Sequence, residues 1–275
     1  MSDGLSNLQI RVVSAVVLGI AVLALTWFGA LPFRLLAALI AGAVFYEWTH
    51  MARANGASRL GFLPEALMLV FIGVLVAGVS ALTTAAVLAL LVAIAAICVA
   101  MRGAGQWDAG GLAYAGLSGF ALAFLRDGDR AGLAAVLFLF AVVWATDIFA
   151  YFVGKAIGGP KLAPAISPGK TRSGALGGAV FGVVAGVLVA AVLGQPNLAS
   201  LAVVALVLSI VAQAGDLFES WVKRRHGAKD SSTIIPGHGG VMDRVDGLVA
   251  AAVALYLIGW MAGSADHPAQ GLFPV

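Results

Sequence analysis

The sequence predicts an all-α integral membrane protein, a polytopic bundle of about nine transmembrane helices with no separate soluble domain. Three observations indicate this class. Hydrophobic residues make up 61% of the 275 positions and charged residues only 11%, against about half and about a quarter in soluble domains. Apolar runs close to the roughly 20 residues of a membrane span follow one another along the chain. Lysine and arginine gather in alternate segments between these runs.

Nine apolar runs are predicted to span the membrane, and the fifth is the shortest. They occupy residues 11–29, 31–49, 62–80, 82–101, 110–125, 131–153, 174–194, 198–218 and 243–262. The first run could pass for a secretory signal peptide, but its apolar stretch is long and no clear small-residue cleavage site follows it before the second run. We divide the chain into scaffold helices at residues 1–130 and helices at residues 131–275 that carry the functional site.

The distribution of positive charge predicts the orientation in the membrane. With a cytoplasmic N-terminus, thirteen of the 16 lysines and arginines fall in cytoplasmic segments, and only Arg34, Arg126 and Arg130 fall outside. The two richest segments, 154–173 and 223–244, then share the cytoplasmic side and can build one site. Because this asymmetry accounts for the basic character of the chain, we expect no nucleic-acid partner.

Polar side chains of the last two runs repeat at helical spacing. The eighth run carries a polar stripe at i, i+3, i+4 and i+7, made of Asp216, Glu219, Ser220 and Lys223. At the start of the ninth run, Asp243 and Asp246 share a face at i, i+3. Carboxylates gathered near a membrane repel one another, and Mg²⁺ would offset that repulsion while binding water and phosphate oxygens. The sequence therefore predicts a metal site, with interhelical salt bridges as the alternative.

Asp147 lies deep in the sixth run, with Tyr151 and Gly154 on the same face at i+4 and i+7. A carboxylate inside the membrane is costly unless it is paired or metal-bound, so we predict that Asp147 supports the metal site. A helix–helix hydrogen bond is the structural alternative. Two other acids, Glu47 and Glu65, lie near helix ends and are interpreted as snorkelling or capping carboxylates.

The seventh run carries a glycine ladder at four-residue spacing, formed by Gly174, Gly178, Gly182 and Gly186. Such a face lets another helix backbone approach closely. The ladder therefore predicts close helix packing, and it suits a homodimer as well as a monomer.

The segment between the eighth and ninth runs is basic and rich in glycine. Its cations are Lys223, Arg224, Arg225 and Lys229, and residues 236–240 read Pro-Gly-His-Gly-Gly. Basic runs of this kind usually anchor a helix on the cytoplasmic side. The glycines also let backbone N–H groups point at an anion, and His238 between them could donate a proton or hydrogen bond to a phosphate. The combination favours a phosphate-binding site.

Residues 220–246, the signature segment, resemble the signature of the phosphatidate cytidylyltransferases, also called CDP-diacylglycerol synthases. That pattern reads Ser-x-x-Lys-Arg-x4-Lys-Asp, a short spacer, then His-Gly-Gly-x-x-Asp-Arg-x-Asp. It is filled by Ser220, Lys223, Arg224, Lys229, Asp230, His238, Gly239, Gly240, Asp243, Arg244 and Asp246. A second segment resembles the family's Asp-x-x-Ala-Tyr helix and following Ser-Pro-Lys-Lys-Thr-Trp-Glu-Gly, with matches at Asp147, Ala150, Tyr151, Ser167, Pro168, Lys170, Thr171 and Gly174. Gly169, Arg172 and Ser173 depart from it.

The resemblance implies transfer of CMP from CTP to phosphatidate, giving CDP-diacylglycerol and pyrophosphate, at the cytoplasmic face of a bacterial plasma (inner) membrane. It implies Mg²⁺, with or without a second, monovalent cation. The expected catalytic residues are Asp216, Lys223, Asp243, Asp246 and His238. The expected substrate and phosphate contacts are Ser220, Arg224, Lys229, Gly239, Gly240, Arg244, Lys170, Arg172 and Ser167. The expected metal ligands are Asp216, Asp243, Asp246 and Asp147.

Three other functions fit part of the pattern. Asp243-x-x-Asp246-Gly247 suggests a CDP-alcohol phosphatidyltransferase, but the Ala-Arg pair and two further aspartates of that pattern do not follow. A CTP-dependent lipid-alcohol kinase shares the general site chemistry and is separated only by the long signature. A cation-coupled transporter would spread ionisable groups over the membrane midplane, whereas here they cluster at one face.

Overall fold

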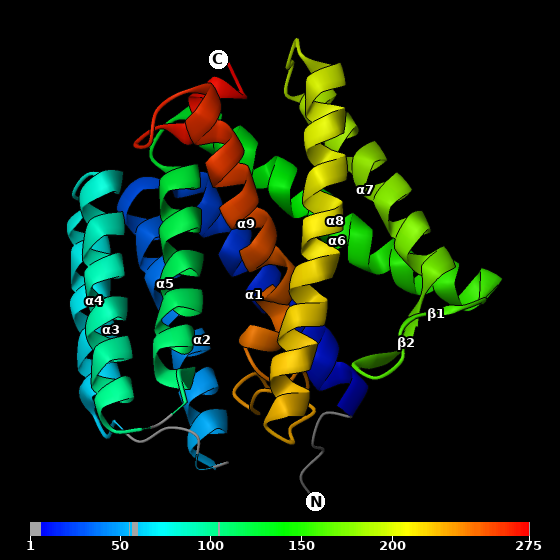
Figure 1. Cartoon of the computed structure of the whole chain (residues 1–275). Coiled ribbons are helices and arrows are strands. Elements are labelled where there is room, and N and C mark those ends of the chain that lie inside the picture. Colours follow the sequence, from blue (N-terminus) through cyan, green and yellow to red (C-terminus); the bar gives the residue numbers. More distant parts are fainter. Residues whose placement is uncertain (1–6, 55, 57–59, 104, 275) are drawn as a thin grey trace, which may run out of the picture.

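The computed structural model describes residues 7–54, 56, 60–103 and 105–274. These residues form nine α-helices and one short β-hairpin (Figure 1). The helices are α1 (Asn7–Phe28), α2 (Ala30–Ala54), α3 (Leu63–Ala77), α4 (Ala81–Met101), α5 (Trp107–Arg126), α6 (Arg130–Ile157), α7 (Arg172–Val192), α8 (Leu198–Arg225) and α9 (Met242–Ala262). The hairpin pairs β1 (Lys161–Ala163) with β2 (Ser167–Thr171) in antiparallel fashion, and a 3₁₀ turn, η1 (Pro268–Gly271), follows α9. The predicted all-α class is confirmed.

Each predicted span corresponds to one helix, and seven of the helices are long and apolar enough to cross a membrane. The two shorter apolar helices are α3 and the Val12–Phe28 part of α1. Among the described helices the shortest is α3, with 15 residues, and not the fifth, because α5 extends from Trp107 to Arg126. Two residues limit α3: Pro64 lies in its first turn, and Gly78 ends it with a φ of +70°.

The eighth helix continues beyond its predicted end at residue 218, and this changes where the cations lie. Its last turn carries Lys223, Arg224 and Arg225, whose positive charges are favourable at the negative end of the helix dipole. Gly227 follows with a φ of +71°, a conformation that ends helices. Lys223 and Arg224 are therefore helical rather than part of the loop, and the connection to α9 comprises only residues 226–241.

The glycine ladder of α7 packs against α6, with all four glycines buried. A Cβ atom at Gly178 would lie 2.6 Å from the carbonyl oxygen of Thr146 on α6, closer than atoms can approach. Thr146 also shares a hydrogen bond with Ser209 of α8, with 2.7 Å between the hydroxyl oxygens. The prediction of close helix packing is confirmed, and the helix that covers the ladder is α6 of the same chain.

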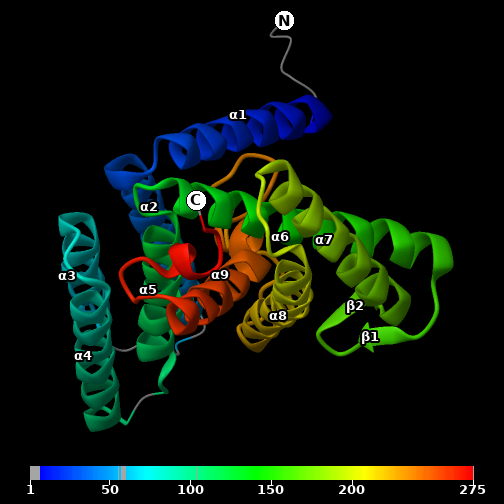
Figure 2. The same cartoon turned by 90° about the horizontal axis from the view of Figure 1, so that it is seen from above.

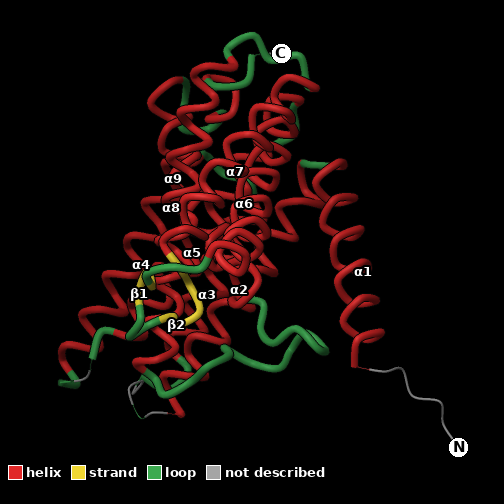
Figure 3. Tube along the Cα trace, turned by 90° about the vertical axis from the view of Figure 1, so that its right-hand side faces the viewer, coloured by secondary structure: helices red, strands yellow, loops and turns green. Residues whose placement is uncertain are grey.

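The two ends of the bundle carry different segments. In Figure 1 helix α1 begins toward the bottom of the view, and the segment that follows α9 lies at the top. The β1–β2 hairpin and the 226–241 connection both lie toward the end of the bundle where α1 begins, which we call the basic end. The two basic segments thus share one end, as predicted, although Arg59, which entered the charge count, lies outside the described residues. Helix α1 runs along the side of the bundle and not through its centre (Figures 2 and 3).

Candidate active site

The polar face of α8 forms at the basic end, as its spacing predicts. Ser220 donates a hydrogen bond from Oγ to Asp216 Oδ1 at 3.4 Å. One turn further, Lys223 Nζ lies 2.7 Å from Glu219 Oε2. Glu219 is only 1% exposed. Because a buried carboxylate is tolerated only when it is paired, the cation of Lys223 allows this face of α8 to point into the protein.

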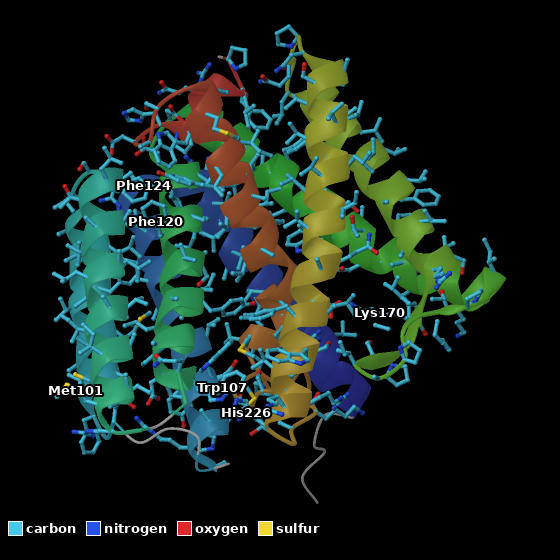
Figure 4. The ribbon with its side chains drawn as sticks, in the orientation of Figure 1. Met101, Trp107, Phe120, Phe124, Lys170 and His226 are labelled. Atoms are coloured by element: carbon cyan, nitrogen blue, oxygen red, sulfur yellow. The ribbon has the colours of Figure 1, made fainter. Side chains whose placement is uncertain are left out.

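A cavity of about 620 Å³ lies between α6, the hairpin and α8. Asp147, Tyr151 and Gly154 line it from α6, which confirms that the i, i+4, i+7 spacing places them on one face. Its basic residues are Lys155, Lys161 and Lys170, and Ser167, Gln213 and Asp216 complete the polar part of its wall. Lys170 forms an ion pair with Asp216 and lies between the hairpin and α8 (Figure 4).

Three carboxylates of different helices interact beside this cavity. Asp147 and Asp216 line it, and Asp246 of α9 lies near enough to both for their negative charges to repel. Lys170 offsets part of that charge. We call Asp147, Asp216 and Asp246 the cavity acids. Their excess negative charge and oxygen ligands suit Mg²⁺, which binds one or two protein carboxylates and leaves its other positions to water and phosphate oxygens.

The cavity acids are spaced more widely than the ligands of a closed ion site. Among the described residues, only Asp127, Asp129 and His267 bring three potential ligand atoms within 4.8 Å of one another. They belong to the connections that follow α5 and α9, at the end of the bundle opposite the basic end. An ion at the cavity acids would therefore have to share its coordination sphere with substrate oxygens or water.

Asp243 has a different environment from Asp246, although both belong to the first two turns of α9. Its Oδ1 lies 2.7 Å from Lys223 Nζ. Its Oδ2 accepts hydrogen bonds from the backbone N–H groups of Ser231 and Gly240, each at 2.9 Å, and lies 2.9 Å from Ser231 Oγ. The glycine turn was predicted to present N–H groups to an anion, and the anion that Gly240 meets here is this protein carboxylate.

Glu47 of α2 also holds the signature segment, from the other side. It is fully buried. Its Oε1 accepts hydrogen bonds from Ser232 Oγ at 2.6 Å and from the Val241 N–H at 2.8 Å. Its Oε2 accepts from the Met242 N–H at 2.7 Å and lies 3.0 Å from Ser231 Oγ. Glu47 is therefore a capping carboxylate, as predicted, but the helix whose N-terminus it caps is α9 and not its own.

The histidine turn is positioned by its backbone and by α1. His238 Nδ1 lies 2.9 Å from Ser14 Oγ, and the same hydroxyl donates to the carbonyl oxygen of Pro236 at 3.2 Å. Gly239 adopts a φ of +84°, and its carbonyl oxygen accepts the N–H of Ile235 at 2.8 Å. Since other residues rarely adopt this φ, the glycine is needed to close the turn.

The remaining predicted phosphate contacts lie on the surface of the basic end. Exposed side chains are found at Arg172, Arg224, Lys229 and Arg244. Arg224 donates from Nη1 to the carbonyl oxygen of Ala228 at 3.1 Å. Arg172 is outside the cavity that Ser167 and Lys170 line. Ser173, which stands where the family pattern has glutamate, contacts the Gly158 carbonyl oxygen and closes the base of the hairpin.

An aromatic cluster anchors the end of α8 to α2 and α5. His226 packs edge-on against Trp107, with 4.5 Å between the ring centroids (Figure 4). Trp107 also packs against Trp48 and Trp221. Burial, and to a smaller degree the positive charge of Arg225, lower the pKa of His226 below its ordinary value. The imidazole is therefore neutral at neutral pH and suits an aromatic environment.

Sequence reasoning missed the partners that hold the signature segment in place. These are Ser14, Ser231 and Ser232, which belong to no recognisable pattern, and Glu47, for which only a capping or snorkelling role was expected. A signal existed for Glu47: it is an acid between Tyr46 and Trp48 in an apolar run, and an ionisable residue within a membrane helix indicates a buried partner.

Comparison with known proteins extends the similarity far beyond the signature segment. Residues 9–262 match the model of the cytidylyltransferase family. A phosphatidate cytidylyltransferase of Brucella suis is 48% identical over 269 residues, which cover 98% of this chain and 99% of the relative. One of Brucella melitensis is similar to the same extent. A phosphatidate cytidylyltransferase of Bacillus subtilis is 31% identical over 264 residues, covering 92% of this chain and 97% of the relative.

Proposed function

Because this chain belongs to the cytidylyltransferase family, we propose that it transfers CMP from CTP to phosphatidate, giving CDP-diacylglycerol and pyrophosphate. The chain is a nucleotidyltransferase embedded in the membrane by its apolar helices. The observation that carries the assignment of the site is the juxtaposition of the cavity acids with a cavity that three lysines line. Acids suit a metal ion and lysines suit phosphate oxygens, so the two together suit a reaction between two phosphate groups.

The cavity also suits a lipid substrate. Tyr151 lines it and is 61% exposed on the outside of α6, next to the exposed Phe152. The cavity therefore reaches an apolar surface of the bundle, where acyl chains can stay in the bilayer while a headgroup enters. Lys155, Lys161 and Lys170 supply the positive charge that a phosphate monoester needs.

Catalysis of this reaction requires alignment of the two phosphate groups and neutralisation of their negative charge more than it requires proton transfer. An oxygen of the phosphatidate phosphate forms a bond to the α-phosphorus of CTP, and the bond from that phosphorus to the pyrophosphate oxygen breaks. The nucleophile is already an anion, so no general base is required. Lys170, which pairs with Asp216 in the structure, would contact a phosphate group of the substrate, and Lys223 holds Asp243 and with it the first turn of α9. Mg²⁺ bound by Asp216 and Asp246, with Asp147 in support, would neutralise the triphosphate; a monovalent cation could share this site.

We infer that the basic end faces the cytoplasm, where CTP is found. The excess of lysine and arginine in the segments of this end supports the orientation. Cys98 is the single cysteine of the chain, so Lys229→Cys in a Cys98→Ala background gives one exposed reporter thiol. A membrane-impermeant maleimide should label it only after the cells are permeabilised. Labelling in intact cells would reverse the orientation.

Purified protein in detergent, given phosphatidate, Mg²⁺ and each nucleoside triphosphate in turn, tests the reaction. We expect pyrophosphate release and a new CDP-lipid that require CTP, lipid and metal together. Transfer of the γ-phosphate with release of CDP would instead make the protein a lipid kinase. Folded protein without turnover on any nucleotide would refute the proposed activity.

A further inference from the structure

Glu47 belongs to none of the sequence motifs, yet its carboxylate lies within hydrogen-bond distance of four donors of the signature segment. It belongs to α2, in the half of the chain expected to act only as scaffold. Each of its two oxygens receives one serine hydroxyl and one backbone N–H group. A fully buried carboxylate with this arrangement is stabilised by the ordered donors around it, so its position and theirs depend on each other.

The two backbone groups that Glu47 accepts belong to the start of α9. The helix begins at Met242, and Val241 in the N-cap position supplies no side-chain cap. The first N–H groups of a helix have no partner within it and form the positive end of its dipole. A carboxylate from another helix satisfies both requirements here, so Glu47 fixes where α9 starts.

The same contacts reach the site through Ser231 and Gly240. Ser231 Oγ lies within hydrogen-bond distance of both Glu47 Oε2 and Asp243 Oδ2, at 3.0 and 2.9 Å. A Cβ atom at Gly240 would overlap Ser231 Oγ and would lie 2.7 Å from both oxygens of Glu47. Asp243 in turn pairs with Lys223 of α8. A continuous set of contacts therefore joins α2 to the first turn of α9 and to α8.

We propose that Glu47 is a positioning residue for the reaction: from α2 it caps α9 and holds residues 231–242, so that Asp243 stays paired with Lys223 and Asp246 stays beside the other cavity acids. The inference rests on the proposed function for its effect on turnover. Displacements of about 1 Å at a reacting centre can lower a rate by about 10²-fold, so a residue that sets the start of α9 can control turnover without touching substrate.

The variant Glu47→Gln tests this with little change of volume. A glutamine has one carbonyl oxygen, and its NH₂ group faces a backbone N–H that can only donate, so one of the two α9 donors loses its acceptor. We expect kcat to fall by about tenfold or more, while KM for CTP changes by less than about threefold. Hydrogen exchange of peptides covering residues 231–242 should become faster. The control is Glu65→Gln, because Glu65 is 34% exposed and pairs with Arg53 at the surface; it should leave both measurements unchanged.

A purely structural Glu47 would give a different result. The midpoint of thermal unfolding would fall, while kcat per folded molecule and exchange in residues 231–242 would remain as in the wild type, and this outcome would overturn the proposal. Wild-type protein is assayed in parallel: if it does not turn over CTP, the proposed function fails, whereas the exchange measurement still reports on the Glu47 contacts.

Two serine variants decide the matter if Glu47→Gln does not fold. Ser231 contacts both Glu47 and Asp243, whereas the hydroxyl of Ser232 contacts Glu47 and the N–H of Ile234. Ser231→Ala should therefore lower kcat by about tenfold and Ser232→Ala by only about threefold, if position is transmitted through these hydroxyls. Wild-type kcat in Ser231→Ala would show that the contacts between Glu47 and Asp243 do not position the site.

Discussion

Two groups of carboxylates at the basic end have opposite environments. Asp243 has both oxygens engaged by the protein, Oδ1 by Lys223 and Oδ2 by donors of the 226–241 connection. The cavity acids Asp147, Asp216 and Asp246 repel one another beside a cavity, and Lys170 is the cation that offsets them. We call Asp243 and Glu219, which share Lys223 as their cation, the internally paired group; these carboxylates are neutralised by internal partners and hold the chain in place. The cavity acids retain negative charge next to open space, which suits them to bind a cation and phosphate groups.

The difference shows why a motif does not assign roles to its members. Asp243 and Asp246 share a helix face at i, i+3, and the sequence predicted the same metal-binding role for both. In the fold, Asp243 pairs with Lys223 and accepts hydrogen bonds from the connection, whereas Asp246 lies within range of the negative charges of Asp216 and Asp147. A metal role for Asp243 stays a prediction, and its internal partners give it a structural role as well.

The largest expected effect comes from breaking the internally paired group at Lys223. In Lys223→Met, both Glu219 and Asp243 lose their common cation, and Glu219 is buried. Removing one partner of a buried ion pair destabilises a protein by about 3–5 kcal/mol. We expect a strongly lowered midpoint of thermal unfolding in detergent, together with loss of CDP-lipid formation. The double variant Lys223→Met/Glu219→Gln should regain part of the stability but no activity; unchanged stability in the single variant would contradict the pairing.

Among the cavity acids, Asp216→Asn should lower activity far more than stability. It removes one of three repelling charges beside the cavity and leaves a side chain of the same size. We expect turnover to fall by about 10²–10³-fold, because the electrostatic contribution to the transition state is lost. The midpoint of thermal unfolding should change little, since the decrease in like-charge repulsion offsets the lost ion pair with Lys170. A loss of stability as large as that of Lys223→Met would mean that Asp216 belongs to the internally paired group.

These environments mark the limit of what the sequence could predict. Helical periodicity correctly placed Asp147, Tyr151 and Gly154 on one face, and the glycine ladder against a neighbouring helix, because both depend on residues within one helix. The apolar run ends at residue 218, but the helical spacing of Asp216, Glu219 and Lys223 already indicated that α8 continues, and it extends to Arg225 because lysine and arginine are good helix formers that are favourable at a helix C-terminus.

Contacts between distant segments were beyond prediction for a physical reason. The carboxylate of Glu47 meets amides almost two hundred positions away, and which residues meet there depends on how the helices pack. Small polar residues such as Ser231 carry no distinct pattern, although they complete the hydrogen bonds of buried acids. The division of the chain at residue 130 stays a prediction, and Glu47 gives the first part a direct contact with the site.

Lys170 and Arg172 are a matched pair of cations whose substitution tests the site at the cavity acids, with a smaller expected effect on activity. Lys170 lines the cavity and pairs with Asp216, whereas Arg172 is exposed outside it. Lys170→Gln should raise the KM of a phosphate substrate by about tenfold, because one charge-assisted contact is lost. It should also lower the Mg²⁺ concentration for half-maximal rate, because Lys170 no longer competes at Asp216. Arg172→Gln should change either quantity by less than about twofold. Equal effects of the two variants would place the substrate outside the cavity.

The smallest expected effect concerns His226, which ends α8 after the turn that holds Lys223. Its pKa is lowered in the folded protein by burial and by Arg225, so the unfolded chain binds a proton more readily. The neutral ring therefore stabilises the fold above the ordinary histidine pKa of about 6.5, and this stabilisation is lost as the pH falls below that value. His226→Phe keeps an aromatic ring against Trp107 and does not titrate. Between pH 7.5 and 5.5 the unfolding midpoint of the wild type should fall by roughly 1–2 °C more than that of the variant. A difference that does not change with pH would mean that His226 titrates alike in the folded and unfolded chain and contributes to stability only through its packing against Trp107.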